Sequence, residues 1–215
     1  MSMSRSGETE TTAAADAPAI EHIASSLLPT RHGSFHIHVY RSHDDGIEHV
    51  ALIKGDLKGQ ERVLARAHSE CLTGDVFGSM RCDCGEQLDA AMAMIAQAGL
   101  GVIVYMRGHE GRGIGLGNKI LAYQLQDQGR DTVEANLDLG LPVDTRNFQV
   151  AVRILEHLGV ESVRLITNNP GKLKKLADHG LKIVERIPVQ TKHTPHNIAY
   201  LRAKQQKLGH LLDFE

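Results

Sequence analysis

Apolar and polar side chains alternate through the first third of the chain. In the stretch SFHIHVY, residues 34–40, every second side chain is apolar and the intervening ones are His or Tyr. This two-residue period is typical of a strand that is buried on one side. Residues 49–56 and 62–70 have similar strand character, and Gly and Asp turns bound them. The pattern therefore predicts a β-rich first part.

A helical period takes over near residue 85 and then alternates with short apolar runs. In the helix predicted over residues 85–99, Leu88, Ala91, Met92 and Ile95 share one face. The further predicted elements are a strand at 101–106, a helix within 113–129, a helix at 144–159 capped by Asp144, a strand at 162–167, a helix at 169–180 with Asn169 as N-cap and Pro170 at its first position, a strand at 181–187, and a helix from about residue 197.

This order of elements predicts an α/β (mixed α+β) fold, with a β-rich N-terminal part followed by alternating β/α units around a largely parallel sheet. Strand–helix–strand units of this length imply right-handed crossovers. Ligands of such sheets bind at the carboxyl ends of the strands. The Ser/Thr/Ala/Glu-rich residues 1–27 are predicted to be a disordered tail, and residues 28–215 a single domain.

Composition narrows the class of protein. The chain has 215 residues, of which 41% are hydrophobic and 23% charged, and its net charge is -2. It lacks the basic excess and the aromatic content that bulk nucleic-acid binding uses. No apolar run reaches the roughly 20 residues of a membrane span, and residues 1–19 lack the apolar core of a signal peptide. We therefore expect a cytoplasmic protein with reduced thiols and with neither nucleic acid nor membrane as a partner.

The three cysteines, Cys71, Cys82 and Cys84, lie close together in the spacing C-x10-C-x-C. A buried apolar cluster and a redox pair are alternatives, but the charged neighbours make a poor core and the C-x-x-C spacing is absent. Thiolates favour zinc, which structural sites bind with four protein ligands and catalytic sites with three ligands and a water. The spacing leaves the fourth ligand open between water and a histidine. The candidate histidines are His36, His38, His68 and His109.

A glycine-rich segment, RGHEGRGIGLGNK at residues 107–119, follows a predicted strand. Its alternate glycines allow the backbone to approach a ligand closely, and Arg107, Arg112 and Lys119 could bind phosphate oxygens. The segment is neither a Walker A loop nor a dinucleotide-binding fingerprint. A flexible turn with solvated charges is the alternative.

Two later stretches offer further contacts for an anion. Arg146 lies at a predicted helix start, where a cation is unfavourable unless an anion is near, whereas Asp144 also suits an ordinary N-cap. Residues 167–172 end a strand and open a helix, which is a second possible phosphate site. Together with the thiols, these stretches predict a cytosolic zinc enzyme that acts on a phosphorylated ligand.

Four stretches in this order, HSECLTGDVFGSMRCDCGEQL, EGRGIGL, LAYQLQDQGRDTVEAN and LITNNPGK, closely resemble GTP cyclohydrolase II of riboflavin biosynthesis. The likeness covers about residues 28 to 212. It implies hydrolysis of GTP to 2,5-diamino-6-ribosylamino-4(3H)-pyrimidinone 5′-phosphate, with release of formate and pyrophosphate. It also implies one Zn²⁺ per chain, Mg²⁺ with the triphosphate, a homodimer, and a monofunctional form without a fused synthase domain.

The resemblance also implies roles for individual residues. Cys71, Cys82 and Cys84 would bind zinc with water as the fourth ligand, and zinc lowers the pKa of bound water toward about 7. Arg146 would be the nucleophile at the α-phosphorus or an electrostatic group, Asp144 the proton acceptor, and Tyr123 a further catalytic residue. The implied substrate contacts are Arg66, Ala67, His68, Ser69, Glu70, Gln87, Glu110, Gly111, Arg112, Thr132, Thr167 and Lys172.

Two other functions stay open on the sequence. One is a non-enzymatic, zinc-stabilised nucleotide-binding module with His68 as the fourth ligand. The other is a cyclohydrolase variant that retains the formyl group, against which the presence of Tyr123 argues by analogy with the family. The sequence departs from the family pattern at two places: the stretch from Arg107 to Glu110 is longer, and Gly117 replaces a bulkier apolar residue. Both departures affect how well ordered the glycine-rich loop is expected to be.

Overall fold

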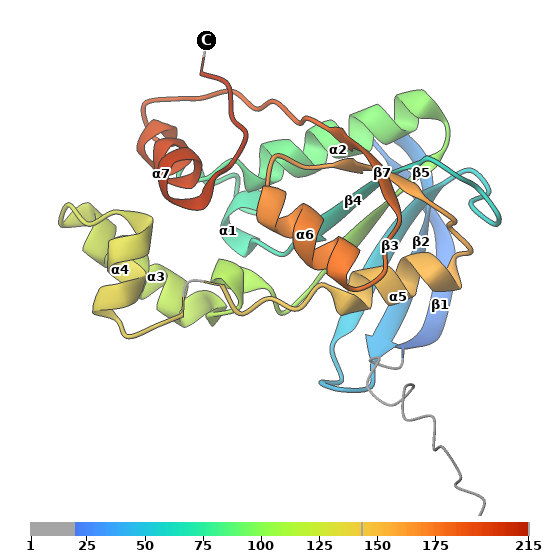
Figure 1. The fold of residues 1–215 in the computed structure, drawn as a ribbon, viewed down its shortest axis with the longest axis horizontal. Helices are drawn as coiled ribbons and strands as arrows, with labels where there is room; N and C mark the ends of the chain where they lie inside the picture. Colours follow the sequence, from blue (N-terminus) through green and yellow to red (C-terminus); the bar gives the residue numbers. More distant parts are fainter. Residues whose placement is uncertain (1–19, 143, 215) are drawn as a thin grey trace, which may run out of the picture.

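A computed structural model of the chain describes residues 20–142 and 144–214. Strands and helices alternate after a β-rich beginning, as the sequence predicted (Figure 1). The elements are β1 (Ile20–Thr30), β2 (Gly33–Ser42), β3 (Glu48–Lys54), β4 (Val63–Ser69), α1 (Leu72–Asp75), α2 (Cys84–Ala98), β5 (Gly101–Met106), the 3₁₀ turn η1 (Glu110–Arg112), α3 (Gly115–Asp127), α4 (Thr132–Asp138), α5 (Gln149–His157), β6 (Val163–Ile166), α6 (Pro170–Asp178), β7 (Ile183–Ile187) and α7 (Ile198–Leu208).

The strands form one sheet of seven in the order β1-β2-β3-β5-β4-β6-β7. The pairs among β1, β2, β3 and β5 are antiparallel, and those among β5, β4, β6 and β7 are parallel. This arrangement confirms the predicted fold class, because hairpin-connected strands come first and crossover-connected strands follow. The parallel half of the sheet brings the carboxyl ends of β4, β5 and β6 to one edge.

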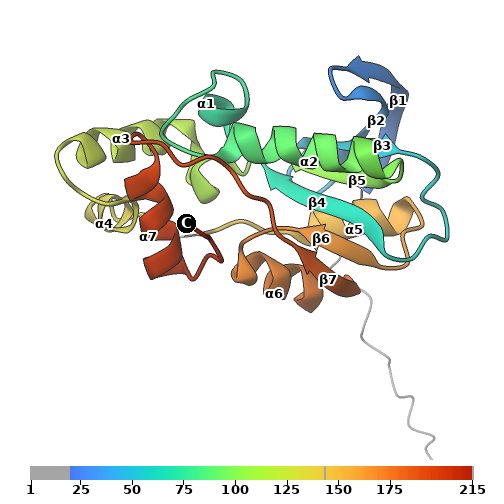
Figure 2. The same cartoon turned by 90° about the horizontal axis from the view of Figure 1, so that it is seen from above.

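Helices cover both faces of the sheet. Figure 2 shows α2 on one face and α5 with α6 on the other. In β5, the side chains of Val102 and Val104 pack with those of α5 and α6, whereas Ile103 packs with Ala91 and Ile95 of α2. Two apolar cores therefore hold β5 from opposite sides, which explains its unbroken run of apolar residues.

The helices α3, α4 and α7 lie beyond the edge of the sheet at which β4 ends (Figures 1 and 2). The strand β4 is buried on both faces up to its last residue, Ser69. Cys71, the first cysteine, lies two residues after the end of this strand. The central strand thus positions Cys71 in the space between the sheet and these three helices.

The N-terminal boundary differs from the prediction. The predicted tail, residues 1–27, overlaps β1, which starts at Ile20 and pairs antiparallel with β2. Residues 20–27 are therefore part of the sheet, and residues 1–19 lie outside the described residues. Most side chains of β1 are exposed because it is an edge strand. It consequently lacks the alternation that identified its neighbour β2.

The helix predicted from Asp144 begins five residues later. Helix α5 starts at Gln149 with Phe148 as its N-cap, and residues 144–148 are irregular. The Asp144 carboxylate accepts a hydrogen bond from the backbone N–H of Arg146, at 3.1 Å, so it stabilises a local turn instead of a helix start. By contrast, Asn169 caps α6 as predicted: its side chain accepts from the backbone N–H of Lys172.

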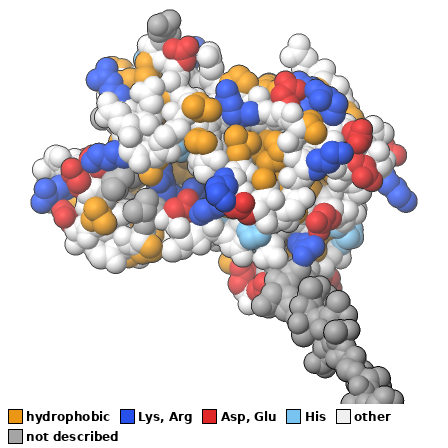
Figure 3. All heavy atoms as spheres, in the orientation of Figure 1, with side chains coloured by type: hydrophobic (Ala, Val, Ile, Leu, Met, Phe, Trp, Pro, Cys, Tyr) orange, Lys and Arg blue, Asp and Glu red, His pale blue; other side chains and the backbone are white. Residues whose placement is uncertain are grey.

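The surface carries charges of both signs. On the face drawn in Figure 3, Lys and Arg side chains are interspersed with those of Asp and Glu. None of the helices in residues 20–142 and 144–214 is long and apolar enough to span a bilayer.

Candidate active site and metal centre

A cleft opens where the parallel strands end. It lies between the carboxyl ends of β4, β5 and β6 on one side and the helices α3 and α7 on the other, which is the position that ligands take in sheets of this type. Its walls carry many charged and polar side chains. They include Arg66, His68, Ser69, Glu70, Cys71, Cys82, Cys84, Gln87, His109, Glu110, Gly111, Arg112, Lys119, Tyr123, Arg146, Thr167, Asn168, Asn169, Lys172, Tyr200, Lys204 and His210.

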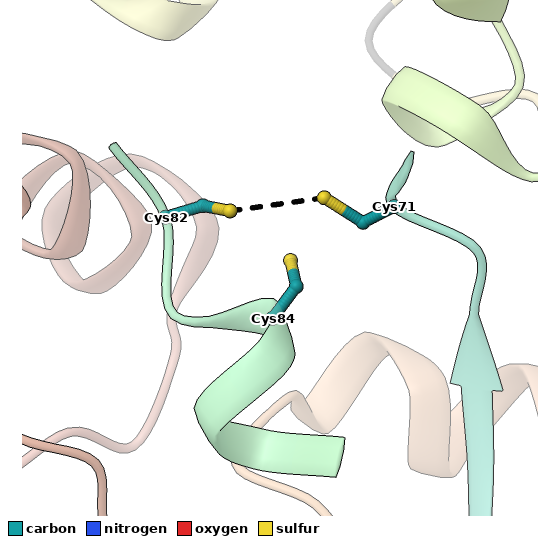
Figure 4. A group of neighbouring side chains, drawn as sticks. All are labelled: Cys71, Cys82 and Cys84. Atoms are coloured by element: carbon teal, nitrogen blue, oxygen red, sulfur yellow. Dashed lines mark hydrogen bonds between the residues drawn. The ribbon is translucent and has the colours of Figure 1, made fainter. Parts of the chain in front are cut away.

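The three cysteine side chains converge in this cleft. Cys71 follows β4, Cys82 lies in the loop before α2, and Cys84 is the first residue of α2. Their sulfur atoms all lie within 4.8 Å of one another, and the Sγ atoms of Cys71 and Cys82 are 3.7 Å apart (Figure 4). The segment after β4 and the start of α2, which are separate in sequence, therefore place their three thiols side by side.

The geometry of the thiols fits one zinc ion. Two sulfurs at about 2.3 Å from a tetrahedral ion lie about 3.8 Å apart, which is close to the 3.7 Å between Cys71 and Cys82. Lys119 donates a hydrogen bond to the Cys71 sulfur at 3.1 Å, and such a cation favours the thiolate. Hydrogen bonds from the other two thiols, together with Lys119, lower the pKa of the Cys71 thiol.

Glycines allow the sulfurs to come together. A β-carbon on Gly74 of α1 would lie 2.8 Å from the sulfur of Cys82 and 3.2 Å from that of Cys71. One on Gly85 would overlap the carbonyl oxygen of Gly74. The close approach of α1 to the start of α2 therefore requires that both positions lack a side chain.

His68 is not placed to complete the metal site. Its Nδ1 accepts a hydrogen bond from the Nε of Arg66 at 3.3 Å, and its Nε2 lies 3.1 Å from both carboxylate oxygens of Asp75. Burial lowers the pKa of His68 to about 4, so the ring is neutral and donates from Nε2 to Asp75. Among the described residues, the metal-binding group of donors consists of the three thiols.

Asp75 connects this histidine to the first cysteine. Its Oδ2 accepts a hydrogen bond from the backbone N–H of Cys71 at 3.0 Å and another from the hydroxyl of Tyr105 at 2.9 Å. A buried carboxylate with several donors holds its neighbours in defined positions. His68 and Asp75 thus orient the chain at Cys71 and do not add a ligand.

The glycine-rich segment makes a tight left-handed turn at the cleft. Gly111, Arg112 and Gly113 all have positive φ angles, of 58°, 68° and 92°. A non-glycine residue in this conformation is strained, and such residues are concentrated at functional sites. The Glu110 carboxylate accepts from Lys119 at 2.6 Å and from the backbone N–H of Leu72 at 2.7 Å, so it ties the turn to α1 and α3.

Asp144 and Arg146 form a two-point ion pair beside the cleft. The Nε and Nη2 of Arg146 donate to the two oxygens of Asp144 at 2.9 and 2.8 Å, and its Nη1 donates to the hydroxyl of Ser69 at 3.2 Å. Burial opposes ionisation of Asp144, but the hydrogen bonds and charge of Arg146 outweigh it and hold the pKa of Asp144 well below its usual range. The guanidinium is fixed toward the cleft.

The start of α6 adds a buried amine. Lys172 donates from Nζ to the backbone oxygen of Ala67 at 2.7 Å. Burial and the nearby guanidinium groups of Arg66 and Arg146 lower its pKa well below the ordinary value for lysine. Thr167 directly follows β6, and its hydroxyl accepts from the backbone N–H of Asn169 at 3.1 Å. An anion in the cleft would favour the charged form of Lys172.

Tyr123 of α3 faces the same cleft from the helical side. The guanidinium carbon of Arg81 lies 5.0 Å, and the Nζ of Lys119 5.7 Å, from the centre of its ring. Burial raises the pKa of the Tyr123 phenol, so it stays protonated at neutral pH.

Most of the residues implied by the family resemblance lie along this cleft. Two of those that the structure describes are not among the lining residues. Ala67 contributes a backbone oxygen that accepts from Lys172, and Asp144 binds Arg146, which does line the cleft. Thr132 begins α4, and its side chain lies outside the described residues. The cleft also contains residues that the sequence had not assigned individually as substrate contacts. These are His109, Asn168, Asn169, Tyr200, Lys204 and His210.

The unexpected residues fall into two groups. His109 lies within residues 107–119, and Asn168 and Asn169 lie within residues 167–172, so the sequence had already singled out these stretches. Tyr200 and Lys204 of the C-terminal helix, and His210 just after it, come from a segment whose sequence carries no recognisable motif. Arg107, one of the cations suggested from the glycine-rich segment, lines a neighbouring cavity with His49 and Asp45 instead.

Comparison with known proteins agrees with the family resemblance that the sequence motifs indicated. A family model described as GTP cyclohydrolase II matches residues 21–188. The chain is 58% identical over 193 residues to the riboflavin biosynthesis protein RibBA of Salinispora tropica, covering 90% of this chain and 48% of that protein. It is 56% identical to the RibBA proteins of Rhodococcus jostii, over 91% of this chain and 49% of that one, and of Mycobacterium tuberculosis, over 89% and 46%. The chain thus spans about half the length of these curated relatives.

Proposed function

The chain belongs to the GTP cyclohydrolase II family, and on that premise we propose that it hydrolyses GTP to 2,5-diamino-6-ribosylamino-4(3H)-pyrimidinone 5′-phosphate, formate and pyrophosphate. The observation that carries the proposal is the convergence of three thiols in a cleft lined by cationic side chains. On the same premise we propose a place in riboflavin biosynthesis, Mg²⁺ bound with the triphosphate, and a homodimer.

The cleft offers separate surfaces for the two ends of a nucleotide. Arg112, Arg146 and Lys172 are the cations proposed for the triphosphate. Gln87 is proposed for guanine, because its amide has both a donor and an acceptor. Cys71, Cys82 and Cys84 are proposed to hold Zn²⁺, which supplies Lewis-acid activation of water when it is bound.

For Arg146 we propose an electrostatic role at the α-phosphate. A carboxylate bonded at two points favours the charged guanidinium, whereas a nucleophile would have to lose its proton first. Arg146 then holds the phosphate in line and stabilises negative charge as water attacks the α-phosphorus and pyrophosphate leaves. Asp144 keeps the guanidinium in this orientation and is proposed, as the family resemblance implies, to take up the proton of the attacking water.

Product analysis tests the proposal. Zinc-loaded protein is incubated with GTP and Mg²⁺, formate and pyrophosphate are quantified, and the pyrimidine is identified by mass. Release of both products supports the proposal; release of neither at one zinc per chain would rule it out. A pyrimidine heavier by one CO group would instead identify a formyl-retaining enzyme.

Replacement of a metal ligand separates an enzyme from a zinc-stabilised binding module. Cys82→Ser is expected to abolish turnover while circular dichroism and cooperative unfolding persist, since a core of this size does not depend on one ion. If the zinc were structural, the same change would unfold the protein. Wild-type protein stripped of zinc and then reloaded is the control, and its turnover is expected to return with the metal.

A further inference from the structure

The C-terminal helix closes one side of the cleft. Tyr200 and Lys204 of α7, and His210 just after it, line the cleft, although the family match ends at residue 188. The backbone N–H of Leu211 donates to the carbonyl oxygen of Asn168, at 2.8 Å, which fastens this segment to the loop after β6. Figure 1 shows α7 near the start of α2, where the last two cysteines lie.

Lys204 crosses from α7 to the loop of the cysteines. Its Nζ donates to Oδ1 of Asp83, between Cys82 and Cys84, at 2.6 Å. The exposed fractions of the two side chains are 8% and 0%, so this ion pair is buried. The Nζ also lies 4.4 Å from the centre of the Tyr200 ring, which supports the cation from the other side. A buried pair of this kind holds both partners, because separation leaves a charge without compensation.

The second carboxylate oxygen of Asp83 binds Gln87, so the ion pair with Lys204 also restricts the position of Gln87. Oδ2 accepts from the Nε2 of Gln87 at 2.5 Å, and the Oε1 of Gln87 accepts from the Nη2 of Arg66 at 2.6 Å. An ionised carboxylate only accepts hydrogen bonds, and a guanidinium only donates them. The amide of Gln87 therefore has one allowed orientation, with its nitrogen toward Asp83 and its oxygen toward Arg66.

We propose that Lys204 is a positioning residue for purine recognition: through Asp83 it sets the orientation of the Gln87 amide and thereby favours GTP over ATP. The inference rests on the proposed function, in which Gln87 contacts guanine. Guanine presents an acceptor at O6, whereas adenine presents a donor at N6. If the Gln87 amide is held in one orientation, it suits either the acceptor of guanine or the donor of adenine. If the amide can rotate by 180°, it can form a hydrogen bond with either base.

Lys204→Met removes the cation and keeps an apolar stem of similar length. We expect the KM for GTP to rise about fivefold or more, because the Gln87 amide is no longer oriented for one of its hydrogen bonds to guanine. The inhibition constant of pyrophosphate is expected to change less than about twofold. The inhibition constant of ATP, relative to the KM for GTP, is expected to fall. Because pyrophosphate probes only the phosphate end, it separates base recognition from a general deformation of the cleft.

Two further variants serve as controls. Lys204→Arg keeps the charge and the donors and is expected to retain most of the wild-type preference for GTP. Arg202→Met removes an exposed cation from the same helix and is expected to behave as wild type. If Lys204→Met does not unfold cooperatively, Lys204→Gln, which removes the charge but keeps a polar side chain, takes its place with the same expected shifts.

An unchanged KM for GTP in Lys204→Met, or in the Lys204→Gln variant that replaces it, would overturn the inference, and so would a parallel rise of the KM for GTP and the inhibition constant of pyrophosphate. The wild-type assay tests the proposed function separately. If zinc-loaded wild type released neither formate nor pyrophosphate, calorimetric dissociation constants of GTP, ATP and pyrophosphate would replace the kinetic ones. An unchanged ratio of GTP to ATP affinity between wild type and Lys204→Met would then contradict the role of Lys204.

Discussion

Gly74 determines how closely the three thiols can approach one another. Its missing β-carbon would lie 2.8 Å from the sulfur of Cys82 and 3.1 Å from the β-carbon of Cys84. We therefore expect Gly74→Ala to weaken zinc binding by about 10- to 100-fold, as changes beside metal ligands do. Competition with a chromophoric chelator measures this affinity.

Gly117 provides the matched control for Gly74. A β-carbon there meets no atom within 4 Å, and the residue lies near the start of α3. Gly117→Ala is expected to leave zinc affinity unchanged and to stabilise the helix by up to about 1 kcal/mol. Wild-type zinc affinity in Gly74→Ala would show that α1 moves away at little cost and would contradict the role assigned to this glycine.

At the same scale, the role of His68 could not be read from its position in the sequence. Its spacing of three residues from Cys71 suited a zinc ligand as well as a substrate contact. Both ring nitrogens are instead engaged, by Arg66 of the same strand and by Asp75 at the end of α1. The number of thiols was readable from the sequence, but the direction of each side chain depends on neighbours.

The helix α6 shows what local sequence predicts well. Asn169 and Pro170 are a strong start signal, and the Asn169 side chain accepts from the backbone N–H of Lys172 at 3.2 Å. Asn169→Ala is expected to lower the free energy of unfolding by about 1 kcal/mol, because it removes this cap. Urea unfolding of the metal-free protein measures the difference.

Lys174→Ala, in the same helix, removes an exposed ion pair with Asp178 and is expected to change stability by less than about 0.5 kcal/mol. Equal stability losses in Asn169→Ala and Lys174→Ala would show that the cap contributes nothing specific. The helix α5 is the contrasting case. Asp144 was an equally plausible cap in sequence, but a tertiary partner, Arg146, occupies its carboxylate at two points.

At the scale of the whole molecule, buried histidines make stability depend on pH. Burial, as the largest cause, lowers the pKa of His68 to about 4 and the pKa values of His109 and His210 to about 3. The unfolded chain, with histidine pKa values of about 6.5, binds protons more readily than the folded chain. Stability is therefore full above about pH 6.5 and decreases as the pH falls toward the folded pKa values.

For His68 alone this loss amounts to at most about 3 kcal/mol. Urea unfolding of the metal-free protein between about pH 7 and pH 4.5 measures the trend, since removing zinc separates it from protonation of the ligands. His68→Gln is expected to flatten the decrease, and a change of the exposed His196 to Gln is expected to leave it as in wild type. Stability independent of pH across this range would contradict neutral burial of these rings.

The arrangement of the sheet explains how the site is assembled. Cys71, Arg112 and Lys172 each follow a different parallel strand, and the order β5-β4-β6 brings their loops together. The sequence predicted the strands β2 to β7 and the type of sheet, because burial on one or both faces leaves a short-range periodicity. The order of strands depends on pairing between distant segments, which no local pattern records.

The strands β2 to β7, most helices, the cap of α6 and the three thiols as candidate metal donors all follow from the sequence, since each depends on side-chain type and near neighbours. The edge strand β1 and the irregular stretch at Asp144 did not follow, because one is mostly exposed and the other is held by an ion pair. The contact between Lys204 and Asp83 joins residues 121 positions apart. Such a pairing exists only after the chain has folded, and it is the folded chain that sets the orientation of Gln87, the partners of His68 and the direction of Arg146.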